Sequence, residues 1–437
     1  TLFRSATYSN PQLNVDYYST TGALTFEFRS SSQPTSIGYW DAFISCYSPK
    51  IFYSKQNGNF DDLNTWYEKY AYENTFRNAT SLPGYREDSV VIDSGHTVYI
   101  ENPNTQSTAP DQVWIKKGGK LVCRSTFYLH NGIGDELLID GELAMEQSPG
   151  KTPFIYGNYY GGETIIVNGT ITASGGTCYI PLYFNTASNQ SVSANNNPYF
   201  ANIYINNLAT VSIHGKLTLN YLFMQSSGKL FLDSSITVNT TLNLKKGIIV
   251  IAGDNPILLN QQTSRIIGGS SESYINGPVT LLAKGNTFVT LKFPVGDAVT
   301  YRPFQVQFSN WGGVKTSMTG RLISSAPEKR NLPAGINDVS DKRYYAVSPA
   351  EKFSGQAIIT LPFSKDEGVT DTANLRIVTD DRAGNWLDMG GKSILNADGS
   401  GSITSSRYVF GYDYFALANA TGGTNTLPVT WIGFTAA

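Results

Sequence analysis

Charge is what this sequence has least of. Only 15% of its 437 residues are Asp, Glu, Lys or Arg, whereas soluble domains usually carry about 25%. The net charge is −2 and the isoelectric point is near 6.0. Such a chain offers no electrostatic reason to bind DNA, RNA or an acidic membrane surface. We therefore expect no nucleic-acid partner.

Cysteine, long apolar runs and familiar catalytic motifs are also lacking. The only cysteines are Cys46, Cys123 and Cys178, so no disulfide framework can form. Cys123 and Cys178 stand among apolar neighbours, which predicts small buried hydrophobes. No run of ~18 apolar residues occurs, so we expect no transmembrane helix. HExxH, CxxC, P-loop and Gly-x-Ser-x-Gly patterns do not occur either, and we predict no catalytic activity.

A short pattern recurs instead. Alternating apolar residues flank a glycine at least six times: VVIDSGHTVYI, VWIKKGGKLVC, LLIDGELAM, IIVNGTITA, VSIHGKLTL and LNLKKGIIVI. The glycines are separated by 24, 22, 28, 46 and 32 residues, and they are Gly95, Gly119, Gly141, Gly169, Gly215 and Gly247. Most steps fit one coil of about 20 to 30 residues, and the longest fits about two. Each unit is a strand, a corner and a second strand, and its apolar rows are buried only when units stack on one another. The repeat therefore predicts a parallel β-solenoid.

The pattern divides the all-β chain into four segments. Residues 1–57 are expected to form an N-terminal β cap, and residues 58–267 the solenoid. A Tyr- and Asn-rich stretch near 181–200 is interpreted as a loop inserted into it and protruding from it. Longer strands between Gly/Pro/Asp turns predict an antiparallel β-sandwich over 268–420. Residues 421–437 are expected to be a linker and the opening strand of a further domain.

Alternation also predicts which residues face the solenoid core. These inward rows are expected to include Ile139, Ile166, Val167, Ile213, Leu217, Leu219, Leu244 and Ile249. Of the three histidines, His96, His130 and His214, the two next to corner glycines, His96 and His214, are expected to bond local backbone.

Aromatic residues are the strongest candidates for binding. They gather on or beside the proposed insertion, where Asn and Gly surround them, and they are Tyr156, Tyr159, Tyr160, Tyr179, Tyr183, Phe184, Tyr199 and Phe200. Rings next to amide groups suit sugar or protein recognition, because a ring covers apolar C–H groups while Asn bonds hydroxyls. We select Tyr183, Phe184, Tyr199 and Phe200 as the candidate ligand-binding residues. Packing of these rings onto the solenoid flank is the alternative.

Acidic residues suggest two further possibilities. A polysaccharide lyase or hydrolase would need convergent carboxylates, and the densest acidic group is Asp135, Glu136, Asp140, Glu142 and Glu146. Solvated charges that keep strand edges apart explain this group equally well. Calcium is the one possible cofactor: Asn396, Asp398 and Ser400 resemble half of a calcium loop, although Arg407 stands where a carboxylate ligand is needed. A hairpin turn at Asp398-Gly399 is the alternative.

Four motifs carry a resemblance to a known family. FYSKQNGNFDDLNTWY followed by DSVVIDSGHTVYI resembles the opening of secreted surface proteins of Bacteroidota. ESYINGPVTLLAKGNTFVTLKFPVGDAVTYRPFQVQF is similar to the segment after the solenoid in those proteins, and RYYAVSP and YFALAN match its later strands. NTLPVTWIGFTA resembles the first strand of the C-terminal sorting domain of type IX secretion cargo. The motifs span the chain from about Phe52 to its end.

The resemblance implies export by the type IX secretion translocon and a secreted or cell-surface location in a Gram-negative bacterium. It also implies that the chain stops within the sorting domain, at its first strand. Proteins of this family include adhesins and enzymes with added domains. O-glycosylation at Asp-Ser/Thr-apolar triplets is a further implication, at Ser89 and Thr372.

These observations lead to one expected function and one alternative. We expect a secreted, surface-displayed, non-catalytic protein with an adhesive or structural role, whose partner is a surface glycan or protein. The alternative is a carbohydrate-binding or polysaccharide-cleaving β-helix protein. Convergent carboxylates and basic residues in a groove would favour cleavage, whereas an aromatic flank poor in carboxylates would favour binding.

Overall fold

The computed structural model describes residues 49–84, 88–105, 108–130, 135–157, 163–259, 261, 264–283, 289–309, 316–350, 356–407 and 414–427. The chain divides into two compact units, Thr1–Pro49 and Lys50–Ala437. Most of the predicted cap therefore lies outside the described residues, and the account below concerns the second unit. Strands make up 55% of the structure and helices 2%, which confirms the predicted all-β class.

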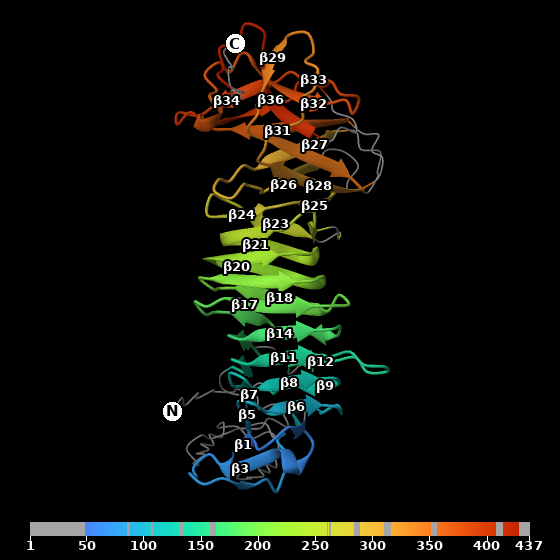
Figure 1. Cartoon of the computed structure of the whole chain (residues 1–437), viewed down its shortest axis with the longest axis vertical. Coiled ribbons are helices and arrows are strands. Elements are labelled where there is room, and N and C mark those ends of the chain that lie inside the picture. Colours follow the sequence, from blue (N-terminus) through green and yellow to red (C-terminus); the bar gives the residue numbers. More distant parts are fainter. Residues whose placement is uncertain are drawn as a thin grey trace, which may run out of the picture. The chain divides into compact units, whose positions relative to one another are not determined.

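A parallel β-solenoid of about 8 turns forms the first part of this unit (Figure 1). Each coil contributes strands to three faces. The first face contains β1 (Lys50–Ser54), β5 (Ser89–Ile92), β7 (Gln112–Ile115), β10 (Leu137–Ile139), β13 (Ile165–Val167) and β16 (Leu182–Phe184). The second contains β2 (Gly58–Asn59), β6 (Thr97–Ile100), β8 (Lys120–Cys123), β11 (Glu142–Met145), β14 (Thr170–Ala173), β17 (Gln190–Ala194) and β19 (Thr210–His214).

The third face contains β9 (Thr126–Tyr128), β12 (Phe154–Tyr156), β15 (Thr177–Cys178), β22 (Ile257–Leu259) and β25 (Val279–Ala283). Higher in the stack, single strands run through the corners and serve more than one face: β18 (Tyr199–Ile205), β20 (Leu217–Leu232) and β21 (Ile236–Ile251). Two short strands, β23 (Arg265–Gly268) and β24 (Ser273–Asn276), continue the first and second faces. Parallel pairing of these strands thus begins at Ile51 and continues to Leu281, beyond the predicted limits of 58 and 267.

The core consists of inward side chains stacked in register from coil to coil. Along the first face, for example, Leu137, Ile165 and Leu182 pair in sequence, and all three are fully buried. The predicted inward residues are confirmed with one exception, because the following are at most 2% exposed: Ile139, Val167, Ile213, Leu217, Leu219, Leu244 and Ile249. Ile166 lies between two inward residues and is half-exposed, since alternate residues of a strand face opposite sides.

The predicted protruding insertion near 181–200 is wrong. This stretch contains β16, β17 and the start of β18, which pair in parallel with the coils on either side. Its interior contains amides as well as apolar residues, which concealed the repeat. Gln190 and Asn207 are buried, and Asn207 Nδ2 donates to Gln190 Oε1 at 2.5 Å and to the Ser188 carbonyl at 2.9 Å. Gln190 in turn donates to the Val167 carbonyl, so the buried polar groups satisfy one another.

Glycine marks one corner of the coils, between the first and second faces. A Cβ on Gly141 would collide with the Gly119 carbonyl, and one on Gly169 would collide with the Gly141 carbonyl. Gly215 instead follows β19, at the corner between the second and third faces. The next glycine at the first corner is Gly228, 59 residues after Gly169, and three coils separate the two. Gly215 lies two coils and one further corner after Gly169, so the step of about two coils is close, but Gly215 does not occupy the equivalent corner.

Antiparallel sheets follow the solenoid. Strand β25 pairs in parallel with β22 on one edge and antiparallel with β28 (Thr316–Ile323) on the other. The sheet continues through β30 (Tyr344–Pro349), β36 (Tyr414–Ala420), β29 (Ile336–Val339), β32 (Leu375–Asp380) and β33 (Trp386–Asp388). A second sheet contains β26 (Val289–Phe293), β27 (Phe304–Ser309), β31 (Gln356–Phe363), β35 (Gly401–Thr404) and β34 (Lys392–Leu395).

The two sheets pack face to face. Phe293 and Phe304 stack at 4.6 Å on the second sheet and lie directly against Gly320 of β28, so that a Cβ there would overlap both rings. This is the packing of the predicted β-sandwich. Residues 421–427 of the predicted linker are anchored to it: Asn425 accepts from the backbone N–H of Asp371 at 2.7 Å, and Leu427 is buried. Residues 428–437 lie outside the described residues.

A buried carboxylate links separate segments at the start of the solenoid by hydrogen bonds. Glu68 in β3 (Trp66–Tyr70) is fully buried and accepts hydrogen bonds from Thr80 Oγ1 at 2.7 Å, Lys50 Nζ at 3.0 Å and Arg77 Nε at 3.3 Å. Burial alone raises the pKa of Glu68, but the bonds from Thr80 and Lys50 outweigh it and lower the pKa to about 2.

Glu68 is expected to make the protein sensitive to acid. A carboxyl whose folded pKa lies below its ordinary value of 4.5 stabilises the fold above that pH, and this stabilisation is lost as the pH falls toward about 2. Glu68→Gln should therefore lower stability at pH 7 and flatten the fall between pH values of about 4.5 and 2. Urea unfolding across this range measures it, with the exposed Glu272→Gln as control. Parallel curves for wild type and Glu68→Gln would contradict the assignment.

Candidate interaction surface on the solenoid

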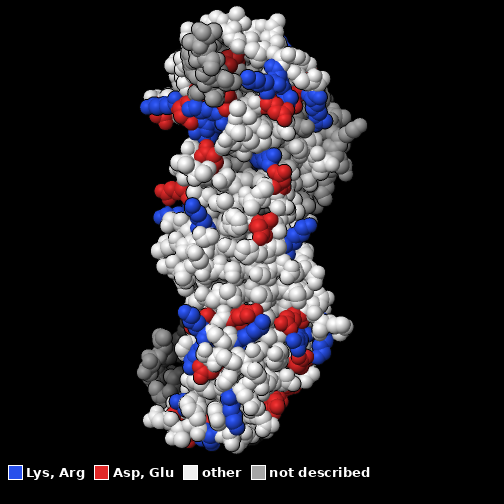
Figure 2. All heavy atoms as spheres, viewed as in Figure 1, with Lys and Arg blue, Asp and Glu red and all other residues white. Residues whose placement is uncertain are grey.

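The middle of the solenoid carries no charged side chain on any face. Residues 164–215 contain no Asp, Glu, Lys or Arg, and they form β13 through β19. We call this segment the uncharged belt. Figure 2 shows it around β14, β17 and β18 as a zone of white atoms between groups of charged residues. Asn, Ser, Thr and Tyr provide its outward polar groups.

Outward aromatic residues stack along the first face, in the belt and in the coil that follows it. Tyr183, Tyr204 and Phe223 occupy successive coils at the same register position. Their ring centroids are 4.4 Å apart at both steps, and the rings are parallel within 5°. The same register position continues through Ile166 and Leu138 to Trp114, which is 39% exposed. We call this column the first aromatic row.

The stacking decides what the first aromatic row can contact. Tyr204 has Tyr183 against one ring face and Phe223 against the other. Only the edges of the inner rings reach solvent, so the row is an apolar strip and not a set of open ring faces. An apolar strip of this kind suits a flat apolar partner surface, since exposed apolar patches mark interaction sites.

A second aromatic row lies on the third face. Tyr128, Tyr156 and Tyr179 follow one another along the axis, with centroids 5.2 Å and 4.7 Å apart and interplanar angles of 19° and 14°. Tyr199, from the next coil, lies 6.0 Å from Tyr179 and is tilted by 55°. We call this column the tyrosine row. Desolvation raises the pKa of Tyr156 and of Tyr199 above the ordinary value, so both phenols stay neutral donors near pH 7.

The four predicted binding residues do not form one platform. Tyr183 belongs to the first aromatic row, whereas Tyr199 lies beside the tyrosine row on another face. Phe184 and Phe200 are fully buried in the core, because each stands next to an outward tyrosine and alternation turns it inward. The prediction that these two phenylalanines are surface binding residues is wrong. Tyr159 and Tyr160 lie outside the described residues.

Sequence reasoning missed most of the first aromatic row. Trp114, Tyr204 and Phe223 were not singled out, since they lie outside the stretch near 181–200 that was interpreted as an insertion. Aligning the coils by their alternation would have placed Tyr183, Tyr204 and Phe223 in one column, with spacings of 21 and 19 residues.

The acidic group proposed for polysaccharide cleavage is divided among separate partners. Glu142 pairs with Lys120 at 3.0 Å and Glu146 with Arg124 at 2.8 Å. The other members bond neighbouring coils: Asp140 accepts from Trp114 Nε1 at 2.7 Å, Glu136 from the Thr164 backbone at 2.5 Å, and Asp135 from Thr164 Oγ1 at 3.0 Å. Burial raises the pKa of Glu136, although the Thr164 N–H bond opposes this shift. These carboxylates thus act as links between coils.

The calcium candidates form a tight turn between β34 and β35. Asp398 Oδ1 accepts from the Ser400 backbone at 2.9 Å and from Ser400 Oγ at 2.6 Å, and Asn396 Nδ2 donates to Ser400 Oγ at 3.0 Å. Gly399 has φ = +79°, as a hairpin turn requires. This geometry is that of the hairpin turn, which was the alternative to a calcium loop. Across the described ranges, no three His, Cys, Asp or Glu side chains gather closely enough to hold a metal ion.

The remaining candidates are mostly embedded in the fold. Cys123 and Cys178 are buried free thiols, as predicted, and burial raises the pKa of Cys178 to about 12. The prediction of backbone contacts is wrong for both histidine rings, because His96 Nδ1 lies 2.8 Å from Ser54 Oγ and His214 Nδ1 lies 2.7 Å from Asp233 Oδ2. The glycosylation candidates Ser89 and Thr372 are both half-buried, and their modification stays a prediction.

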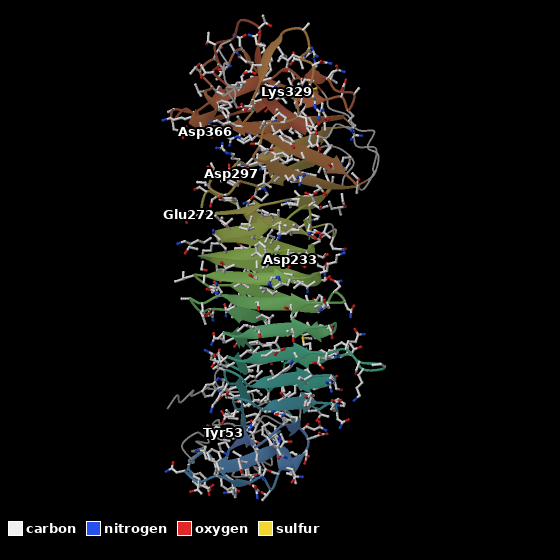
Figure 3. All side chains as sticks on the ribbon, viewed as in Figure 1. Tyr53, Asp233, Glu272, Asp297, Lys329 and Asp366 are labelled. Carbon is white, nitrogen blue, oxygen red and sulfur yellow. The ribbon has the colours of Figure 1, made fainter. Side chains whose placement is uncertain are left out.

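A second cluster of charged residues, in the sandwich, is paired internally. Arg302 and Arg343 are each 5% exposed, and both bond Asp366 Oδ2, at 2.8 Å and 2.6 Å. Asp297 and Glu367 complete the cluster (Asp297 and Asp366 are labelled in Figure 3). Burial opposes ionisation of Asp366, but bonds from Ser364 and Arg343 lower its pKa to about 2. Because three carboxylates surround two guanidinium groups, the cluster is a structural link between loops.

The fold defines an all-β class, a parallel β-solenoid followed by antiparallel β-sheets. Comparison with known protein families, curated proteins and solved structures finds no match to this chain. No helix among the described residues is both long and apolar enough to span a membrane.

Proposed function

We propose that this chain is a secreted, surface-displayed and non-catalytic β-solenoid protein with an adhesive or structural role. The observations that carry the adhesive part are the uncharged belt and the two outward aromatic rows, which cross the belt and extend beyond it. Export by the type IX route is proposed on the sequence motifs alone, above all FPVGDAVTYRPF and NTLPVTWIGF.

The belt is suited to binding for two physical reasons. Its contact surface contains no charge to desolvate, and burying an unpaired charge is the costliest part of forming an interface. The rows also stand on strands that are hydrogen-bonded to the coils above and below, so little conformational entropy is lost when a partner is bound. A rigid neutral surface with ordered aromatic side chains can thus hold a partner with few contacts.

Carbohydrate binding is the second candidate, and a specific observation favours it. In the tyrosine row, Tyr179 is the most exposed ring, at 47%, and its neighbour Tyr199 is tilted away from a parallel stack. This arrangement differs from the closed stack of the first aromatic row. Polysaccharide cleavage has less support, because the proposed carboxylates are engaged by separate partners.

The adhesive role is tested by retention of the purified chain on immobilised surfaces. A panel of neutral and anionic glycans and of extracellular proteins serves as the surface, with lyase and hydrolase assays in parallel. Tyr183→Ser combined with Tyr204→Ser should reduce retention roughly tenfold on the surfaces that the first aromatic row contacts. Phe231→Ser is the matched control, since Phe231 is an outward ring on the second face, outside both rows.

Two results would contradict the proposal. One is release of reducing or unsaturated sugar products by the wild-type chain, which would establish an enzyme. The other is a failure of the wild-type chain to be retained on every surface of the panel. Fractionation of the producing cells tests the location separately, and a wholly cytoplasmic protein would contradict surface display.

A further inference from the structure

The tyrosine row ends on an open ring face. Tyr156 stacks on one side of Tyr179 at 4.7 Å, with 14° between the ring planes. On the other side the next coil presents Ala201, which stands one residue beyond Phe200, the partner of Cys178 in the parallel ladder. Extended by one residue, this register places an alanine, and not a fourth aromatic residue, next to Tyr179 in the column. Tyr199 stands to the side, 6.0 Å away and tilted by 55°.

The two aromatic rows differ in how accessible their ring faces are. Both faces of Tyr204 are covered at 4.4 Å, so no planar group can stack on it. Among the described residues, only Tyr156 stacks on Tyr179, which is 47% exposed, the highest exposure among the rings of either row. An open aromatic face next to a small residue is the geometry needed to receive the apolar face of another ring.

Polar side chains stand next to this opening. Asn220 follows Ala201 in the same column, one residue beyond Leu219, which pairs with Phe200. Asn220 is half-exposed, and its amide forms no hydrogen bond with the described residues. Beside it, Thr218 pairs with Tyr199 and donates through Oγ1 to Asn197 Oδ1 at 3.1 Å. The opening thus has amide and hydroxyl groups within one coil of the free ring face.

We propose that Tyr179, Ala201 and Asn220 form a binding subsite for one pyranose ring of an uncharged glycan. The proposal rests on the adhesive function above and specifies its ligand. The C–H face of the sugar stacks on Tyr179, Ala201 leaves room for the ring, and Asn220 bonds its hydroxyls. The ligand is neutral because residues 164–215 and 217–228 contain no Lys or Arg to pair with a carboxylate or sulfate.

The test measures binding of soluble oligosaccharides to the full chain by titration calorimetry. Neutral hexose oligomers are compared with uronic-acid oligomers of the same length. Tyr179→Ala should weaken binding of the neutral oligomers about tenfold or more, and Tyr179→Phe should stay within about threefold of wild type, because it keeps the ring. Asn220→Ala should weaken binding several-fold through the lost hydrogen bonds.

Ala201→Tyr is the most specific variant. It completes the stack over Tyr179 and so closes the ring face, and binding should fall about tenfold while the thermal midpoint is unchanged or raised. A general loss of structure cannot produce this combination. Lys216→Ala is the matched control at the edge of the belt, and it should leave binding of neutral oligomers unchanged.

Each alternative outcome overturns the subsite. Binding of uronic-acid oligomers that equals that of neutral ones and disappears in Lys216→Ala would assign an anionic ligand. Unchanged binding in Tyr179→Ala and Ala201→Tyr would place the glycan elsewhere. No binding of any oligomer, together with retention on protein surfaces, would refute the subsite but leave the adhesive role intact. Loss of retention on every surface would refute both.

Discussion

Replacing Phe200 by alanine is expected to lower the free energy of unfolding by about 3–5 kcal/mol, the usual cost of deleting a buried aromatic ring. Phe200 is fully buried, and it pairs in the ladder with Cys178 below and Leu219 above, both of which are also fully buried. The coils cannot collapse into the cavity, because backbone hydrogen bonds hold them at fixed spacing along the axis. Urea unfolding of the variant measures the loss.

Tyr199→Ala is the matched control for Phe200→Ala. Tyr199 is adjacent in sequence but faces outward, where it contacts Tyr179 at 6.0 Å. Its removal should cost about 1 kcal/mol or less, the value of one aromatic contact. If Phe200→Ala proved as stable as Tyr199→Ala, the inward assignment of Phe200 would be wrong and the protruding-loop interpretation of this stretch would return.

Gly141→Ala is expected to cost roughly 3 kcal/mol although it adds a single methyl group. The Cβ would overlap the carbonyl oxygens of Gly119 and Lys116 in the preceding coil. Relief by local movement is blocked, because Gly141 N donates to the Ile115 carbonyl at 3.0 Å and Glu142 N to the Gly119 carbonyl at 3.0 Å. Lower thermal and urea midpoints, or insolubility, would reveal the strain.

Gly95→Ala separates close packing from backbone conformation. Gly95 has φ = +81°, which disfavours alanine by about 1–2 kcal/mol, but a Cβ there would meet no atom within 4 Å. Gly141→Ala should therefore be the more damaging change. Equal stabilities of the two variants would show that the corner glycines are required for their backbone angles and not for the approach of successive coils.

A stack of coils also explains how one chain can carry two different aromatic surfaces. Each coil contributes outward positions to all three faces, so Tyr183 and Tyr199 lie on separate faces although only 16 residues separate them. The first aromatic row offers ring edges and the tyrosine row ends in an open ring face. Variants in the two rows should therefore affect different partners.

Local sequence determined the strands, the fold class and most of the core. Alternation in LLIDGELAM and IIVNGTITA identifies Ile139 and Val167 as inward, and the glycine between the two strands marks a corner. These inferences succeed because period-2 alternation is a property of a strand, whatever its neighbours are. The same property places Phe184 and Phe200 inside, and treating the stretch as a loop was the error.

Tertiary structure decided where the coils turn and which residues meet between them. Gln190 and Asn207 are inward amides that bond each other, carbonyls of adjacent coils and the Ala209 backbone N–H, and these partners are not visible in the sequence. The column partners Tyr128 and Tyr156 are 28 residues apart, whereas Tyr204 and Phe223 are 19 apart. Alternation along the chain determines whether a side chain points inward or outward. Its neighbours in other coils depend on coil length, which varies, and on the hydrogen bonds between coils, so only the folded structure determines them.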